Sequence, residues 1–204
     1  MPQVDSAQDS LDDKSLDLLF RHARSQNGWL PEGISDEKLR IIWDIAKWGP
    51  TSANCSPIRV LFLRSEEAKS RLRPHLDASN VSKVMTAPAV AVFGFDTEFY
   101  KHLPRLFHNP AARTWYEGPH KKDVAYQTAF RNSSLQAAYL MIAARAVGLE
   151  CGPMSGFKND AVDREFWSGT AVKTNFICGI GHGDPALLYG RQPRFAFEDV
   201  CRIL

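Results

Sequence analysis

The chain has 204 residues, of which 44% are hydrophobic and 24% charged, with a formal net charge of +2. These values are ordinary for one globular domain, and the scattered basic residues exclude a nucleic-acid partner. No apolar run reaches about 18 residues and no signal peptide begins the chain, so we expect no membrane partner and a cytoplasmic protein with reduced thiols.

The helical elements are predicted from apolar spacing and capping residues. Residues 1–10 are expected to form a disordered tail, and residues 11–204 one domain. Helices are predicted over residues 11–23, 35–46, 65–76, 124–147 and 159–167, with Ser35 and Ser65 as N-caps. The apolar stripe of the first helix is Leu11, Leu16, Leu19, Phe20 and Ala23, and that of the longest is Leu135, Tyr139, Ile142 and Ala146.

Short β-rich runs predict strands over residues 59–63, 89–95 and 172–180, and the middle run is apolar enough for a buried strand. Three strands interleaved with five helices indicate helices packed around one small sheet, in a domain of the α/β or α+β class. Residues 96–120 carry eight aromatic or histidine side chains in irregular order. We expect this segment to be an excursion, acting as a lid or a packed dimer arm, rather than a core element.

Several motifs allow a functional and a purely structural interpretation. The run from Gly179 to Asp184 resembles half of a dinucleotide fingerprint, but no helix-opening glycine follows, so close backbone packing at a strand end is predicted. No C-x-x-C or H-x-x-x-H pair is present, and no metal site is predicted. Cys55 is a reactive thiol or, more simply, a small buried residue.

Three segments could contact a polar, flat ligand. The run Gly49-Pro-Thr-Ser-Ala-Asn-Cys-Ser-Pro57 is either a ligand-binding loop or an ordinary helix-to-strand turn. Arg24, Arg191 and Arg194 carry the group that suits a phosphate, or are solvated surface charges. Glycines at 152 and 156 allow backbone to approach a flat ring.

In order along the chain, these segments resemble the FMN-binding segments of the nitroreductase family. The segments are 24–29, 49–57, 80–83, 152–157 and 190–194. The residues at positions 29–30, 129–134 and 152–157 resemble those of the malonic semialdehyde reductases, also called 3-hydroxypropionate dehydrogenases. The chain departs from the family pattern at Gln26-Asn27-Gly28, where a basic residue is usual, and in the three-residue spacing of Arg191 and Arg194.

The resemblance implies a fold, a cofactor and a set of contacts. It implies an α+β fold with a central mixed sheet surrounded by helices, and an intertwined homodimer with FMN sites at the subunit interface. The implied cofactor-binding residues are Arg24, Gln26, Pro50, Thr51, Ser52, Asn54, Asn80, Lys83, Pro153, Ser155, Gly156, Arg191 and Arg194. The arginines would face the phosphate, Asn80 and Lys83 the pyrimidine end of the flavin, and residues 50–54 the FMN of the other subunit.

The resemblance also implies the chemistry. NADH or NADPH would give hydride to flavin N5, and the substrate would take it from there, so no catalytic side chain is predicted. We expect reduction of malonic semialdehyde to 3-hydroxypropionate. The alternatives are a broad nitro- or quinone-reductase and a flavin-binding protein without efficient turnover. Arg131 is the candidate partner of a substrate carboxylate, unless it pairs with Asp123 or Glu150 of its own chain.

Overall fold

The computed structural model describes residues 10–204, so the tail predicted over residues 1–10 lies outside the described part except for its last residue. The helices are α1 (Asp13–Leu16), α2 (Asp36–Ala46), α3 (Glu66–Leu72), α4 (Ala78–Thr86), α5 (Leu103–Leu106), α6 (Lys122–Ala146), α7 (Asn159–Phe166) and α8 (Phe197–Val200). The strands are β1 (Ile58–Leu63), β2 (Ala89–Asp96), β3 (Glu150–Met154) and β4 (Val172–Gly181). No helix among these is both long and apolar enough to cross a membrane.

The four strands form one sheet in the order β1-β2-β4-β3, and each neighbouring pair is antiparallel. The predicted α+β class is confirmed, whereas the expectation of a mixed sheet is wrong for these strands. The described parallel contact is an isolated bridge between Ser25 and Cys151. The sequence missed β3, because Gly152 and Pro153 within it weaken the strand pattern.

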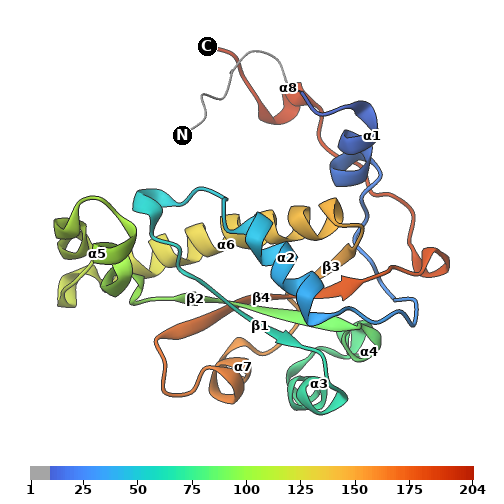
Figure 1. Cartoon of the computed structure of the whole chain (residues 1–204), viewed down its shortest axis with the longest axis horizontal. Coiled ribbons are helices and arrows are strands. Elements are labelled where there is room, and N and C mark those ends of the chain that lie inside the picture. Colours follow the sequence, from blue (N-terminus) through green and yellow to red (C-terminus); the bar gives the residue numbers. More distant parts are fainter. Residues whose placement is uncertain (1–9) are drawn as a thin grey trace.

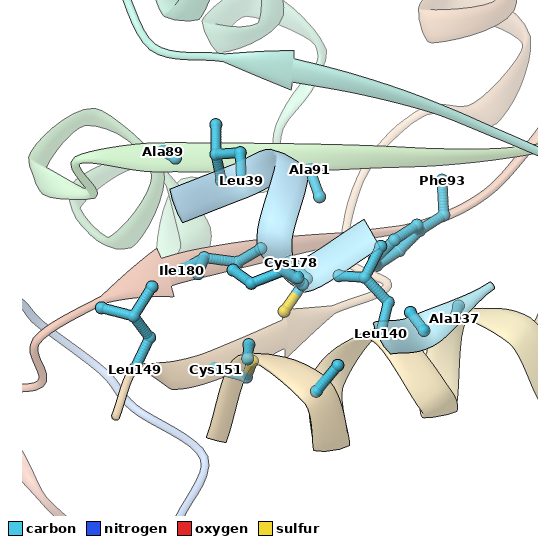
Figure 2. Close-up of a cluster of buried hydrophobic side chains, with 14 of the residues drawn as sticks. Leu39, Ala89, Ala91, Phe93, Ala137, Leu140, Leu149, Cys151, Cys178 and Ile180 are labelled. Carbon is cyan, nitrogen blue, oxygen red and sulfur yellow. The ribbon is translucent and has the colours of Figure 1, made fainter. Parts of the chain in front are cut away.

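Helices cover both faces of this sheet (Figure 1). α2 and α6 lie on one face, and α3, α4 and α7 lie on the other. Every residue of β2 is buried, which explains why its sequence is a continuous apolar run rather than an alternating one. Figure 2 shows Ala91 and Phe93 of β2 directed toward Leu140 of α6, within the larger core cluster.

The N-caps predicted at Ser35 and Ser65 are confirmed. The Ser35 hydroxyl accepts a hydrogen bond from the Lys38 N–H, and the Ser65 hydroxyl accepts one from the Ala68 N–H. Both contacts satisfy an N–H that the first helical turn leaves without a partner. The helices that they begin, α2 and α3, lie within the predicted ranges. Their starts could be predicted because an N-cap contact joins residues only three positions apart.

The buried face of α6 is not the stripe predicted for it. Leu135 and Tyr139 are 47% and 42% exposed, whereas the residues facing the sheet are mostly small. These buried residues are Ala125, Ala129, Asn132, Ser133, Gln136, Ala137, Leu140, Ala143 and Ala144. Small side chains let the helix approach the sheet closely, and the large apolar side chains of the predicted stripe therefore face outward.

The first predicted helix is also different in the structure. α1 is followed by a π-helical turn over Asp17–Arg21, and neither segment has a buried residue. Leu11 and Phe20 are about half exposed, so the apolar stripe predicted for this helix is not buried against the rest of the described chain. α1 and the C-terminal α8 both stand away from the sheet (Figure 1).

The segment 96–120 contributes to the core, contrary to the prediction. It contains the short helix α5 and several 3-10 turns. Phe99, Leu103 and Ala112 are fully buried in it and pack with Phe95 of β2 and Ala129 of α6. Aromatic side chains that lack any period can still form a core when the chain folds back on itself, so the irregular order was misleading.

Candidate functional site

Four arginine side chains line one cavity of about 490 Å³ at the C-terminal end of α6. They are Arg24, Arg145, Arg191 and Arg194, and they come from segments up to 170 residues apart in the sequence. The other lining residues are Phe20, Ala23, Ser25, Asn27, Tyr189, Gly190 and Gln192, and none of them is acidic. The cavity wall is therefore strongly positive.

The arginines are held in place by backbone carbonyls. Arg24 Nη2 donates to the Tyr189 carbonyl at 2.5 Å, and Arg191 Nη2 donates to the Arg21 carbonyl at 2.6 Å. Arg145 Nη1 donates to the Leu19 carbonyl at 3.1 Å. A guanidinium has five N–H donors, so most of the donors in this cluster stay available.

No carboxylate in residues 10–204 forms an ion pair with any of these four arginines. Like charges gathered around one cavity repel each other, and an anion bound between them relieves that repulsion. Several convergent guanidinium groups match the oxygen geometry of a phosphate. The donor set therefore fits a phosphate group, which is what the phosphate end of FMN would require.

The cavity continues toward α4. Asn27 and Tyr189 also line a second cavity of about 370 Å³, in which Lys83 is the charged residue. Its remaining lining residues are Ser79, Ser82, Ala186, Leu187 and Leu188. The two cavities therefore adjoin at Asn27 and Tyr189, and we call them together the groove. The structure thus places Lys83 along the same groove as the arginines, although these residues are far apart in sequence.

Asn80 lies one helical turn before Lys83 and connects α4 to the segment after β3. Its Nδ2 donates to the Gly156 carbonyl at 2.9 Å, and the Asp77 N–H donates to the same carbonyl at 3.0 Å. A Cβ at Gly156 would lie 2.6 Å from Asn80 Nδ2, so a larger residue would force this contact apart. Ser155, next to Gly156, is exposed.

Two of the predicted ligands are placed less favourably. Gln26 is buried, and its Nε2 donates to Glu150 Oε1 at 2.5 Å while its side chain packs on Gly183. Its side chain therefore lies beneath the groove rather than in it. Pro153 is exposed on β3 and lines neither of the two cavities.

The glycine-rich end of β4 is a packing surface, as predicted. A Cβ added at Gly179 would lie 2.5 Å from the Trp29 ring, and one at Gly181 would lie 2.9 Å from it. A Cβ at Gly183 would lie 2.2 Å from the Gln26 side chain. The absence of side chains at these positions lets the segment around Trp29 lie directly on the sheet.

The loop Pro50–Asn54 lies elsewhere. The Ser52 N–H donates to Asn132 Oδ1 at 2.8 Å, and Asn54 Nδ2 donates to the Leu106 carbonyl at 2.8 Å. Thr51 Oγ1 accepts from the Ser56 N–H within the loop, and Ala53, Asn54 and Ser56 have positive φ angles. Asn132 precedes Arg145 by 13 positions on α6, which corresponds to roughly 20 Å along the helix axis.

Arg131 is exposed on α6, beside Asn132. In the described part of the chain it forms no ion pair with Asp123 or Glu150, the two intramolecular partners considered from the sequence. Glu150 instead accepts from Gln26 and from the Gly183 N–H. The Arg131 side chain is therefore open to another partner, and its sequence neighbour Asn132 contacts the Pro50–Asn54 loop.

Cys55 is not a nucleophile in this site. It is fully buried, as the simpler interpretation of the sequence predicted. Burial raises the pKa of its thiol to about 11, which keeps the thiol protonated at neutral pH.

Comparisons with known proteins agree with this architecture. The model of the nitroreductase family matches residues 21–182. The chain belongs to the nitroreductase family. Two relatives carry the name "Putative NADH dehydrogenase/NAD(P)H nitroreductase". One, from Cupriavidus pinatubonensis, is 57% identical over 92% of this chain and 96% of its own length, and the other, HadB from Ralstonia pickettii, is 58% identical over 93% and 97%.

Solved structures support the same fold. An Exiguobacterium sibiricum protein crystallised in complex with FMN superposes with a TM-score of 0.83 at 23% identity, covering 97% of this chain and 99% of its own. The Bacillus subtilis protein ydfN superposes with a TM-score of 0.82 at 19% identity, covering 91% and 97%. The predicted nitroreductase-like fold and oxidoreductase class are thereby confirmed, whereas the malonic semialdehyde branch stays a prediction.

Sequence reasoning missed Arg145 and Tyr189. Arg145 lies in the last turn of the longest helix, where a basic residue is usually explained by the helix dipole. Tyr189 belongs to an extended segment without a motif of its own. Only the folded chain brings both to the arginine cavity.

Proposed function

We propose that this chain is an FMN-dependent NAD(P)H oxidoreductase that reduces malonic semialdehyde to 3-hydroxypropionate as a homodimer in the cytoplasm. The observation that carries the FMN assignment is the cavity with four arginines and no carboxylate in its lining. The FMN in the Exiguobacterium complex and the NAD(P)H in the relatives' names support the same cofactor and electron donor.

When bound, FMN supplies a ring that accepts hydride from a reduced nicotinamide and passes it to a second substrate. Arg24, Arg145, Arg191 and Arg194 would hold its phosphate. Lys83, as the charged residue of the adjoining cavity, would stabilise negative charge on the ring when it is reduced. Asn80 and the Ser155–Gly156 backbone would orient the ring through hydrogen bonds.

The homodimer is supported by an apolar surface on α2 and α6. These two helices pack against each other. The exposed large apolar side chains on them and in the turn after α2 are Ile41, Trp43, Ile45, Trp48, Tyr126, Phe130, Leu135 and Tyr139. Many large apolar side chains exposed on neighbouring elements are typical of a surface that another protein covers. A second copy docked there would cover this surface.

Dimerisation would also complete the cofactor site. Because the loop Pro50–Asn54 and the arginine cavity lie at different points along α6, one loop and one cavity could meet across the interface. Arg131, next in sequence to the Asn132 that contacts this loop, would then face the substrate side of the flavin of the other subunit. A bidentate contact with a carboxylate is the interaction that would favour a semialdehyde acid.

A broad nitro- or quinone-reductase is the second candidate, favoured by the names of the two close relatives. A flavin-binding protein without efficient turnover is the third. Steady-state oxidation of NADH and NADPH, measured with malonic semialdehyde and with an uncharged quinone, separates all three. A higher kcat/KM for the semialdehyde supports the main proposal, and a higher value for the quinone supports the second candidate.

The cofactor assignment is tested first. The purified protein is expected to be yellow, and chromatography of the heat-released cofactor is expected to give FMN. Recovery of FAD, or failure to bind any flavin on reconstitution, would refute the assignment.

The variant Arg131→Ala tests the substrate assignment. Loss of a charge-assisted contact of about 1.5–3 kcal/mol lowers kcat/KM for the semialdehyde roughly 10- to 150-fold. Activity with an uncharged quinone and the flavin content should stay unchanged. Equal losses with both substrates would remove Arg131 from the substrate site.

A further inference from the structure

The Trp29 ring packs against three glycines of the sheet. Added Cβ atoms at Gly152, Gly179 and Gly181 would lie 3.2, 2.5 and 2.9 Å from its ring. These three residues belong to β3 and β4. Trp29 is only 8% exposed, so these close contacts restrict the position of the indole.

The fixed indole makes one hydrogen bond, and its partner is Lys83. Trp29 Nε1 donates to the Lys83 backbone carbonyl at 2.9 Å. This carbonyl belongs to the last turn of α4, which ends at Thr86 because Ala87 is extended and precedes Pro88. Carbonyls in a last helical turn lack intrahelical donors and need them from elsewhere.

A second side chain completes the end of α4. Lys69 of α3 is buried, and its Nζ donates to the carbonyls of Met85 and Ala87 at 2.8 and 2.9 Å. A cation at a helix C-terminus also interacts favourably with the helix dipole. Trp29 and Lys69 together prevent the fraying that helix ends otherwise show.

The contacts of Trp29 and Lys69 matter because the last turn of α4 also carries Lys83. Lys83 is the charged residue of the cavity that adjoins the arginines. Its side chain forms no ion pair with a described residue. Its side chain is therefore anchored only through the helix turn from which it extends, and Trp29 bonds that turn at Lys83 itself.

We propose that Trp29 is a positioning residue that holds Lys83 against the reduced flavin. This inference rests on the proposed function, in which Lys83 stabilises negative charge on bound FMN. A pre-organised cation stabilises that charge without reorganisation, whereas a cation on a frayed turn does so only part of the time. The indole N–H, rather than the bulk of the ring, is the group that matters.

The chain offers a matched control for the indole N–H. Trp167 is also 8% exposed, and its ring also packs on a glycine, because a Cβ at Gly94 would lie 3.0 Å from it. Its Nε1 is buried without a hydrogen-bond partner among the described residues. Trp167→Phe therefore removes the same atoms as Trp29→Phe without removing a hydrogen bond.

The experiment measures the midpoint potential of bound FMN in the full-length protein, together with FMN affinity and melting temperature. Lys83→Met is expected to lower the affinity for reduced FMN about tenfold relative to that for oxidised FMN. This change lowers the midpoint potential by about 30 mV for a two-electron couple. Trp29→Phe should lower this ratio about threefold, and Trp167→Phe should leave it unchanged. In the double variant Trp29→Phe/Lys83→Met, the first substitution should add nothing to the second.

Three results would overturn the inference. A Trp29→Phe potential equal to that of the unmodified protein assigns Trp29 a purely structural role, whatever happens to the melting temperature. Additive shifts in the double variant mean that Trp29 acts independently of Lys83. An unchanged potential in Lys83→Met means that Lys83 does not stabilise the reduced flavin, so Trp29 cannot act through it. A protein that binds no FMN refutes the proposed function itself, which separates the two failures.

Discussion

The arginine cavity predicts how the protein distinguishes FMN from riboflavin, which has the same ring without the phosphate. We consider Arg24→Gln, because glutamine keeps a polar side chain at this position without the charge. Its amide nitrogen corresponds to Arg24 Nε, so the bond from Arg24 Nη2 to the Tyr189 carbonyl at 2.5 Å is lost together with the other guanidinium donors. Titration with riboflavin as well as FMN then separates a lost phosphate contact from a disturbed cavity wall.

The expected magnitude follows from the donors that are lost. Arg24 uses one described hydrogen bond, to the Tyr189 carbonyl, so four of its five N–H groups stay available for an anion. One charge-assisted bond to phosphate contributes about 1.5–3 kcal/mol, which corresponds to a roughly 10- to 150-fold change in Kd. Because three other arginines remain, the loss for the single variant should lie near the lower end of that range.

The assay is fluorescence titration of the apoprotein with FMN and with riboflavin. FMN affinity should fall in Arg24→Gln, and the loss should shrink as ionic strength rises, because salt screens the charge. Riboflavin affinity should barely change. Arg73→Gln serves as the matched control, since Arg73 is exposed and lines neither cavity. If Arg24→Gln weakens both ligands equally, the cavity does not bind the phosphate.

Three further predictions concern stability, thiols and assembly. Lys69→Met should lower the free energy of unfolding in urea by about 2–4 kcal/mol, because two carbonyls lose their donor, and a change below 0.5 kcal/mol would contradict the described capping of α4. In native protein at pH 8, a thiol reagent should react quickly at exposed Cys201 alone; fast labelling of Cys55, whose pKa burial raises to about 11, would contradict its packing. Sedimentation should give twice the 22.9 kDa chain mass, and Leu135→Asp should yield monomers that have lost FMN; a variant that remains dimeric would place the interface elsewhere.

Local features of the sequence determined part of this protein unaided. Ser35 and Ser65 begin helices because each hydroxyl reaches an N–H three residues away, which requires no tertiary contact. The apolar run of β2 indicated a strand covered on both faces, and the structure buries all of it. The glycines at the end of β4 predicted close packing, although not that Trp29 would be the partner.

The tertiary structure decided the features that depend on contacts between segments remote in sequence. Helical periodicity places Leu135 and Tyr139 on one face of α6, but it does not say whether that face meets the chain's own sheet or looks outward. The cavity is a stronger example, because Arg24, Arg145 and Arg191 are ordinary surface cations until the chain brings them together without a carboxylate. Their charges become a binding site only through distances between segments remote in sequence, and local pattern does not encode those distances.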